Sequence, residues 1–229
     1  MEQRPAVTAT STSFLRGWPT RTGEFESGFA FGASGIAHAL LALHQRTGSP
    51  GLRDAAEEAT ALEDTLFVSA ENVWLDGSSQ RTGGLPIGRR FGGWCRGSTG
   101  IGLSRVASLR VNDTPRTRAG VAAAIASMPA AAPGTPEHLA KPDHLWRGNL
   151  GQAELLMTAG IRLARPDLEM RAREMAQRVA ERARRRGTYG DGTMESAFTP
   201  GLFDGLAGIG YELLRLCDPA GVPSILLFE

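Results

Sequence analysis

A Gly-x-x-Gly motif occurs four times along the chain, each time directly before an apolar segment. Successive copies lie 65, 51 and 57 residues apart. A single copy would carry little information, but four copies at similar intervals indicate an internal repeat. The four glycine pairs are Gly32/Gly35, Gly97/Gly100, Gly148/Gly151 and Gly205/Gly208.

The segments around these motifs are predicted to be helical. Alanine and leucine dominate the segments that follow the motifs, and β-branched residues are sparse, which favours α-helix. Residues 52–66 and 166–186 space apolar residues three and four apart among charged ones, as amphipathic helices do. Each repeat is therefore predicted to contain an amphipathic outer helix, a loop, a glycine turn and an apolar inner helix.

Helical hairpins of this kind cannot bury their apolar faces alone, so they stack on one another. The pattern predicts an all-α fold and leaves two arrangements open, a solenoid and a closed ring (an α/α toroid). In a ring, the glycine turns would point to one face and surround a central pocket. Glycine would suit such turns because two backbones can approach closely there.

Composition excludes several classes of protein. The chain has 229 residues, of which 41% are hydrophobic, and a formal net charge of +1. A disordered chain and a basic nucleic-acid binder are therefore disfavoured. Two cysteines cannot form a disulfide framework, and no apolar run approaches the ~20 residues that span a bilayer. We expect a cytoplasmic globular protein that binds neither nucleic acid nor membrane.

The chain is predicted to consist of a short leading segment and one repeat domain. Residues 1–25 are rich in Thr, Ser and Arg and are expected to be flexible, whereas residues 26–229 hold the repeats. Within the domain, residues 73–93 and 128–144 are rich in Gly, Ser or Pro and are predicted to be irregular loops. Each precedes a glycine turn, so both are candidates to frame the mouth of a pocket.

The glycine motifs resemble those of the lanthionine synthetase C-like (LanC-like) family. The resemblance runs from about residue 28 to residue 229, and the closing segment looks most like the C-terminal end of class II (LanM-type) lanthipeptide synthetases. The segments that carry it are GFAFGASGIAHALL, GGWCRGSTGIGLSR, LWRGNLGQAELL and TPGLFDGLAGIGYELLRLCDPAGVPSILLFE.

This resemblance implies a fold and a reaction. The family fold is an α/α toroid of seven helical hairpins, and its members close thioether rings in ribosomal peptides. A zinc ion, held by two Cys and one His, activates a peptide cysteine thiol, which adds to dehydroalanine or dehydrobutyrine. Zinc suits this chemistry because it deprotonates a bound thiol at neutral pH. Because only four hairpins are apparent, we expect an incomplete α/α toroid.

Three of the family's chemical positions are altered in this chain. Phe31 stands where the first motif carries an active-site His, and the third motif, Cys-His-Gly in the family, reads Trp146-Arg147-Gly here. Neither Trp nor Arg can ligate zinc. The second motif keeps one zinc-ligand position as Cys95, followed by Arg96 where His or Tyr is frequent. One thiolate does not make a zinc site, so no cofactor is expected.

Other side chains offer little to rebuild the zinc site. A site made from Cys95 and His144 would still lack a third ligand. His38 and His44 are expected to be packed or on the surface, and Cys217 to be a thiol in the core. The remaining candidate, His138, lies in the same predicted loop as His144.

The altered positions suggest binding roles. Arg147 places a positive charge where the family has zinc, so it is a candidate to bind a carboxylate or phosphate, or is an ordinary surface residue. Trp146 and Phe31 either fill the emptied pocket or stack on a peptide side chain. Together, Arg96, Trp146, Arg147 and His144 form the predicted peptide-binding group. Cys95 is either a reactive thiol, activated by a neighbouring arginine, or a buried small residue.

Other charged groups have structural interpretations. Asp204 in the fourth turn is predicted to cap a helix, and residues 182–186 (RARRR) to stabilise the C-terminal end of a helix while staying solvated. A toroid that hydrolyses sugars would need paired carboxylates across the pocket. The glycine turns have only Asp204 and Glu154 nearby, which disfavours that class of enzyme.

The leading hypothesis is a degenerate, zinc-free cyclase-like protein of lanthipeptide maturation. It would bind a dehydrated precursor peptide or a partner synthetase. The alternative is an active lanthionine cyclase that forms thioether rings. Because four hairpins cover little more than half of a seven-hairpin ring, we expect a partner chain or self-association to complete the toroid.

Overall fold

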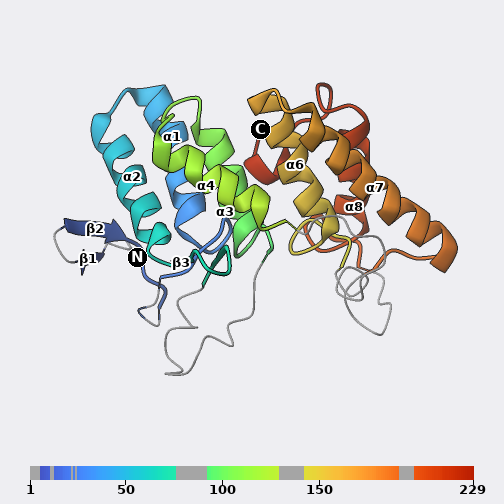
Figure 1. The fold of residues 1–229 in the computed structure, drawn as a ribbon, viewed down its shortest axis with the longest axis horizontal. Coiled ribbons are helices and arrows are strands. Elements are labelled where there is room, and N and C mark those ends of the chain that lie inside the picture. The colour runs from blue at the N-terminus through green and yellow to red at the C-terminus, as the bar shows by residue number, and fades with distance from the viewer. Residues whose placement is uncertain are drawn as a thin grey trace. The chain divides into compact units, whose positions relative to one another are not determined.

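The computed structural model comprises two compact units, residues 1–127 and 128–229, and each is described by itself. The described residues contain seven α-helices, one short 3₁₀ helix and two small antiparallel strand pairs (Figure 1). The all-α prediction is therefore confirmed. The structure describes residues 6–10, 13–21, 23, 25–75, 92–128, 142–190 and 199–229.

The helices of the first unit are α1 (Ala33–Thr47), α2 (Pro50–Asp64), α3 (Ser98–Ser108) and α4 (Pro115–Ala126). α1 packs on α2 and α3 packs on α4, so the unit contains two helical hairpins, and α1 also contacts α3 (Figure 1). Small side chains on α1 and α2 let the two helices pack closely, with Ala37, Leu41, Ala56 and Ala59 at the centre of the contact.

The tight link between α1 and α2 follows from its sequence. Gly48 has a φ of 70°, a left-handed conformation that glycine adopts without a steric penalty, and its N–H donates to the carbonyl of His44 to end α1. Two residues later, Pro50 begins α2 in the first helical turn, where its missing N–H costs nothing. Gly48 and Pro50 together therefore end one helix and begin the next within three residues.

The helices of the second unit are α6 (Asn149–Leu163), α7 (Pro166–Arg186) and α8 (Leu206–Cys217), followed by the 3₁₀ helix η2 (Ile225–Leu227). α6 packs along α7, and α8 contacts both (Figure 1). Every residue of α6 from Asn149 to Gly160 is buried, so this helix forms the core of the unit. α7 is amphipathic, as its sequence predicts, and buries one stripe that includes Leu168, Ala172 and Val179.

The four glycine turns share one backbone contact, which explains the repeat. A Cβ atom on the second glycine of each motif would lie 2.3 Å or less from the carbonyl oxygen of the residue six positions earlier. Only glycine permits such an approach. The distances are 2.0 Å from Gly35 to Phe29, 2.1 Å from Gly100 to Trp94, 2.3 Å from Gly151 to Leu145 and 1.6 Å from Gly208 to Leu202.

Several elements were not predicted from the sequence. α4 is one, and two strand pairs are the others: β1 (Ala6–Thr10) with β2 (Ser13–Gly17), and β3 (Phe67–Val68) with β4 (Val73–Trp74). The predicted loops at residues 73–93 and 128–144 lie largely outside the described residues, which resume at residues 92 and 142.

Candidate functional site

The first two glycine turns lie side by side in the first unit and are joined through their backbones. The N–H of Phe29 donates to the carbonyl of Trp94 at 3.0 Å, and the N–H of Phe31 donates to the carbonyl of Cys95 at 3.3 Å. The ring of Phe29 stacks on that of Trp94, with the ring centroids 5.3 Å apart. The two turns therefore form a single packed layer that fixes Phe31 beside Cys95.

Arg96 connects the same two turns through its side chain. Its guanidinium forms a two-point ion pair with Glu26, in which Nη2 lies 2.8 Å from Oε1 and Nε lies 2.8 Å from Oε2. It also lies over the ring of Phe31, with Cζ 4.8 Å from the ring centroid. Phe31 is nevertheless 51% exposed, so part of its aromatic surface is accessible in the first unit.

Cys95 is 3% exposed and forms no disulfide. Of the two interpretations proposed for it, the burial favours a packed small residue over a reactive thiol, because a thiol must meet solvent or substrate to react.

The third and fourth turns are joined in the second unit. The N–H of Trp146 donates to the carbonyl of Phe203 at 2.8 Å, and the two rings meet edge to face with centroids 5.9 Å apart. Trp146 is half-buried and Arg147 beside it is exposed. This pair of turns therefore presents an aromatic edge and a positive charge next to each other.

His144 is 5% exposed and supports the Arg147 backbone. Its Nδ1 accepts the N–H of Arg147 at 3.4 Å. Burial, reinforced by the charge of Arg147, lowers the pKa of His144, although Asp204 and Asp143 act in the opposite direction. The lowered pKa favours the neutral imidazole, the form that can accept a hydrogen bond at Nδ1.

A buried carboxylate holds the first turn in place. Glu63, at the end of α2, accepts the N–H of Gly28 at 2.9 Å, the N–H of Ser34 at 3.2 Å and the hydroxyl of Ser34 at 2.5 Å. Burial raises the pKa of Glu63 despite the nearby guanidinium of Arg105. Sequence reasoning missed this residue, although it continues the buried stripe of Ala55 and Ala59 at four-residue spacing.

Asp143 holds the third turn. It is fully buried, accepts the amide of Asn149 at 2.9 Å and the N–H of Gly190 at 2.7 Å, and forms an ion pair with Arg182. The prediction that Arg182 stays solvated at a helix end is therefore wrong. It is 7% exposed because it lies on the buried stripe of α7, one turn after Val179.

Two further predictions are corrected. Cys217 is exposed rather than in the core, because the buried side of α8 near its end consists of Arg215 and Leu216. Asp204 does not cap α8. The N-cap is Gly205, and no side chain accepts a hydrogen bond from the first turn.

The side chains at the family's zinc-ligand positions do not fit a zinc site. Only Cys95 can donate to the metal, whereas Trp146 and Arg147 cannot. Within the ranges that the structure describes, no three His, Cys, Asp or Glu residues lie close enough to hold a metal ion. His138 lies outside these ranges. His38, which lies on α1 after the first turn, packs against Phe29 with the two ring centroids 5.1 Å apart.

All four glycine turns lie within one family match. The model of the lanthionine synthetase C-like proteins matches residues 9–227. The chain belongs to the LanC-like family. Membership supports a lanthipeptide-related role, and the resemblance of the glycine motifs to the LanC-like family is thereby confirmed. No curated protein compared with the chain matches it. None of the helices in the described part of this LanC-like chain is long and apolar enough to cross a membrane.

Proposed function

We propose that this LanC-like protein binds a dehydrated precursor peptide, or the synthetase that makes it, and does not close thioether rings with zinc. The observation that carries the proposal is the replacement of two zinc ligands by Trp146 and Arg147 on an otherwise regular glycine turn. The turn retains its backbone contact, while its side chains have changed from metal ligands to an aromatic ring and a cation.

These side chains suit peptide recognition. The exposed guanidinium of Arg147 can bind a carboxylate in a two-point contact, and the half-buried ring of Trp146 can cover an apolar side chain. In the first unit, the exposed ring of Phe31 is held by the Arg96–Glu26 ion pair and offers a second apolar face. In this proposal His144 is a positioning residue, because it is buried and contacts the backbone of Arg147.

Assembly with a second chain is part of the proposal. Several apolar side chains on and after α8 are exposed, among them Leu206 at 37%, Leu214 at 65% and Phe228 at 68%. Helical hairpins bury such faces against a neighbour. A partner synthetase, or a second copy of the chain, would cover them and complete the toroid. We place this role in the cytoplasm, where ribosomal peptides are made.

The second candidate is a zinc-independent cyclase, and the exposed cation of Arg147 favours it. A guanidinium near a peptide cysteine would stabilise the thiolate after the thiol proton leaves to solvent. The sulfur would then form a bond to the β-carbon of dehydroalanine, and the α-carbon would take up a proton, so no leaving group is needed. Holding the two peptide groups in contact would supply the rate enhancement.

Binding of a synthetic peptide that contains dehydroalanine and cysteine tests the proposal. We expect fluorescence anisotropy to show saturable binding that Arg147→Ala weakens about tenfold, the effect of losing a charged hydrogen bond. Arg110→Ala, a change at an exposed arginine of the first unit, is the matched control and should leave binding unchanged. Absence of binding by the parent chain would contradict the peptide-binding form of the proposal and leave the synthetase as the partner to test.

Mass spectrometry of the same mixture separates the two candidates. The binding role predicts ring closure at the uncatalysed rate and less than stoichiometric zinc in the purified protein. Faster closure without zinc would establish the second candidate. Stoichiometric zinc together with closure would show that other residues have restored the metal site.

A further inference from the structure

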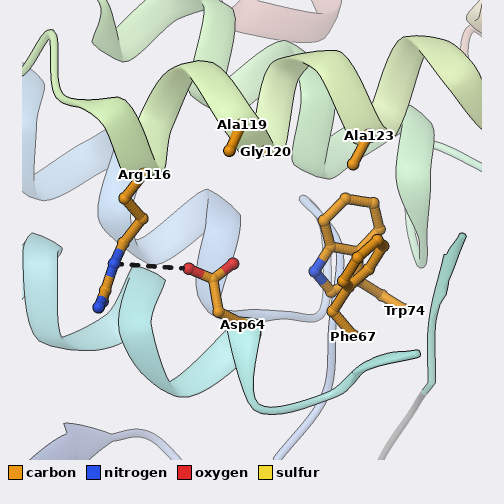
Figure 2. Close-up of a pocket in the computed structure, with 7 residues that line it drawn as sticks. All are labelled: Asp64, Phe67, Trp74, Arg116, Ala119, Gly120 and Ala123. Carbon is orange, nitrogen blue, oxygen red and sulfur yellow. Dashed lines mark ion pairs between the residues drawn. The ribbon is translucent and has the colours of Figure 1, made fainter. Parts of the chain in front are cut away.

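A cavity of about 190 Å³ lies in the first unit, between the end of α2, the β3–β4 pair and α4 (Figure 2). One wall is formed by the rings of Phe67 and Trp74, whose centroids lie 4.5 Å apart. The opposite wall is formed by the small residues Ala119, Gly120 and Ala123 of α4. None of the described lining residues belongs to a glycine turn, so the cavity is separate from the proposed peptide site.

The small residues of α4 create this space. Figure 2 shows Ala119, Gly120 and Ala123 along the edge of α4 that faces the two aromatic rings. A Cβ on Gly120 would lie 2.4 Å from Nη1 of Arg105, so this guanidinium packs closely against α4 without lining the cavity. A larger residue on this edge would occupy the cavity itself.

One buried hydrogen-bond donor in the lining of the cavity, Nε1 of Trp74, has no acceptor among the described residues. The Trp74 side chain is only 3% exposed. Figure 2 shows the indole nitrogen on the edge of Trp74 that faces Asp64 across the cavity. Buried donors are almost always paired, so this donor in the cavity wall indicates that a ligand supplies its acceptor.

The charges around the cavity favour an anionic acceptor. Asp64 is already paired with Arg105, with Nη2 2.8 Å from Oδ1. Arg116 is 58% exposed and only loosely paired, with Nε 3.9 Å from Oδ2 of Asp64, so it can turn toward a ligand. Glu63, which also contacts Arg105, is not among the residues that line the cavity.

We propose that this cavity binds a small aromatic carboxylate. The ring would lie between the aromatic wall and α4, and the carboxylate would accept from Nε1 of Trp74 and from the guanidinium of Arg116. The size is suitable, since an apolar cavity of about 150 Å³ in another protein holds benzene. This inference does not depend on the proposed function, because the two sites share no residue.

The indole N–H signal of Trp74 is a direct reporter of binding. In ¹⁵N-labelled full-length protein, Trp74→Phe would assign the signal by its disappearance. We expect phenylacetate to shift this signal saturably, while the other tryptophan signals move less. Toluene, which lacks the acceptor, should bind at least tenfold more weakly, the effect of losing a hydrogen bond to a charged group. Benzylamine, which carries the opposite charge, should not bind.

Filling the cavity provides the matched test. Ala123→Leu should abolish the response to phenylacetate, whereas Ala122→Leu, on the exposed side of the same helix, should preserve it. Circular dichroism would establish that both variants fold. Calorimetry should show that Trp74→Phe, which keeps the ring and loses the N–H, weakens phenylacetate binding about tenfold.

Three outcomes would overturn the inference. The first is a Trp74 signal that does not respond to phenylacetate at tens of millimolar. The second is an equal response in Ala123→Leu, which would place the ligand elsewhere. The third is tighter binding of benzylamine than of phenylacetate, which would reverse the inferred polarity of the site.

Discussion

The first and third glycine turns are each held by a buried carboxylate, but the carboxylate comes from a different part of the chain in each. At the first turn it is Glu63, which lies at the end of α2 and is 35 residues from Gly28, whose N–H it accepts. At the third turn it is Asp143, which lies six residues before its partner Asn149. The first turn is therefore held by a residue far away in the sequence, and the third turn by a residue close to it.

The arginines that pair with the two carboxylates also differ in how many acids they contact. Arg105 divides its contact between Glu63, at 3.4 Å, and Asp64, at 2.8 Å. Arg182 forms an ion pair with Asp143. Glu63 is therefore poorly compensated for its burial, which is why its pKa is raised. The comparison shows that the same kind of turn can be held by a buried carboxyl that shares its arginine with a neighbouring acid, or by one that is paired with its own arginine.

Neutralising Glu63 and Asp143 in turn should reveal the largest difference in stability between the two turns. Asp143→Asn leaves Arg182 buried without a counter-ion, and such losses cost about 3–5 kcal/mol. Glu63→Gln keeps an acceptor for the backbone N–H groups and should cost about 1 kcal/mol. Urea denaturation, with hydrogen exchange to separate the units, would measure both. Equal losses in the free energy of unfolding would show that the two carboxylates contribute equally to stability.

Adding a methyl group to the second glycine of each turn should have the next largest effect, and it should be alike in both turns. Gly35→Ala and Gly151→Ala each place a Cβ against a backbone carbonyl, at 2.0 and 2.3 Å, and overpacking of this kind costs about 1–3 kcal/mol. Gly51→Ala, in α2 with open space around it, is the control and should cause no loss of stability. A loss in only one turn would contradict the shared backbone contact.

The raised pKa of Glu63 should make the first unit sensitive to pH. The folded state holds this proton more tightly than the unfolded state, whose carboxyl titrates near 4.5. The stability is therefore fully present below that value and is lost as the pH rises through the raised pKa, by at most about 1.4 kcal/mol per pH unit. Glu63→Gln should remove this dependence, as followed by urea midpoints from pH 4 upward. An unchanged slope in the variant would assign the effect to another group.

Removal of Arg96 should have the smallest effect. Arg96→Ala loses a two-point ion pair and a ring contact that are partly exposed, and we expect a cost of about 1 kcal/mol or less. Arg118→Ala removes an exposed pair with Asp113 and is the control, for which no measurable change in the urea midpoint is expected. A larger loss for Arg96→Ala would show that it ties the first two turns together more strongly than its exposure indicates.

The sequence predicted the helices that carry a periodic signal and missed those that do not. α1, α3, α6 and α8 follow the glycine motifs, and α2 and α7 show amphipathic spacing, whereas α4 has neither feature. The two-residue strands β3 and β4 are too short to show alternation. The hairpin of β1 and β2 was not apparent either, because its Thr and Ser residues also suit irregular structure.

For the site, the motifs identified the residues at the turns but not the residues behind them. Phe31, Cys95 and Arg96 lie together in the first unit, and His144, Trp146 and Arg147 lie together in the second. The predicted peptide-binding group of Arg96, His144, Trp146 and Arg147 stays a prediction. Glu63, Asp143 and Trp74 belong to no motif, and their roles depend on long-range packing. A charged residue on an otherwise apolar stripe, such as Glu63 or Arg182, was the one available signal.

The carbonyl contact of the glycine turns separates architecture from chemistry. In each turn the contact joins the first and last residues of a seven-residue span, from Phe29 to Gly35 or from Leu145 to Gly151. The positions at which the family resemblance places reactive residues stand one or two places after the carbonyl, at Phe31 in the first span and at Trp146 and Arg147 in the third. A metal ligand at these positions could therefore be replaced by an aromatic ring or a cation without loss of the backbone contact. The reverse replacement could be engineered in the same way.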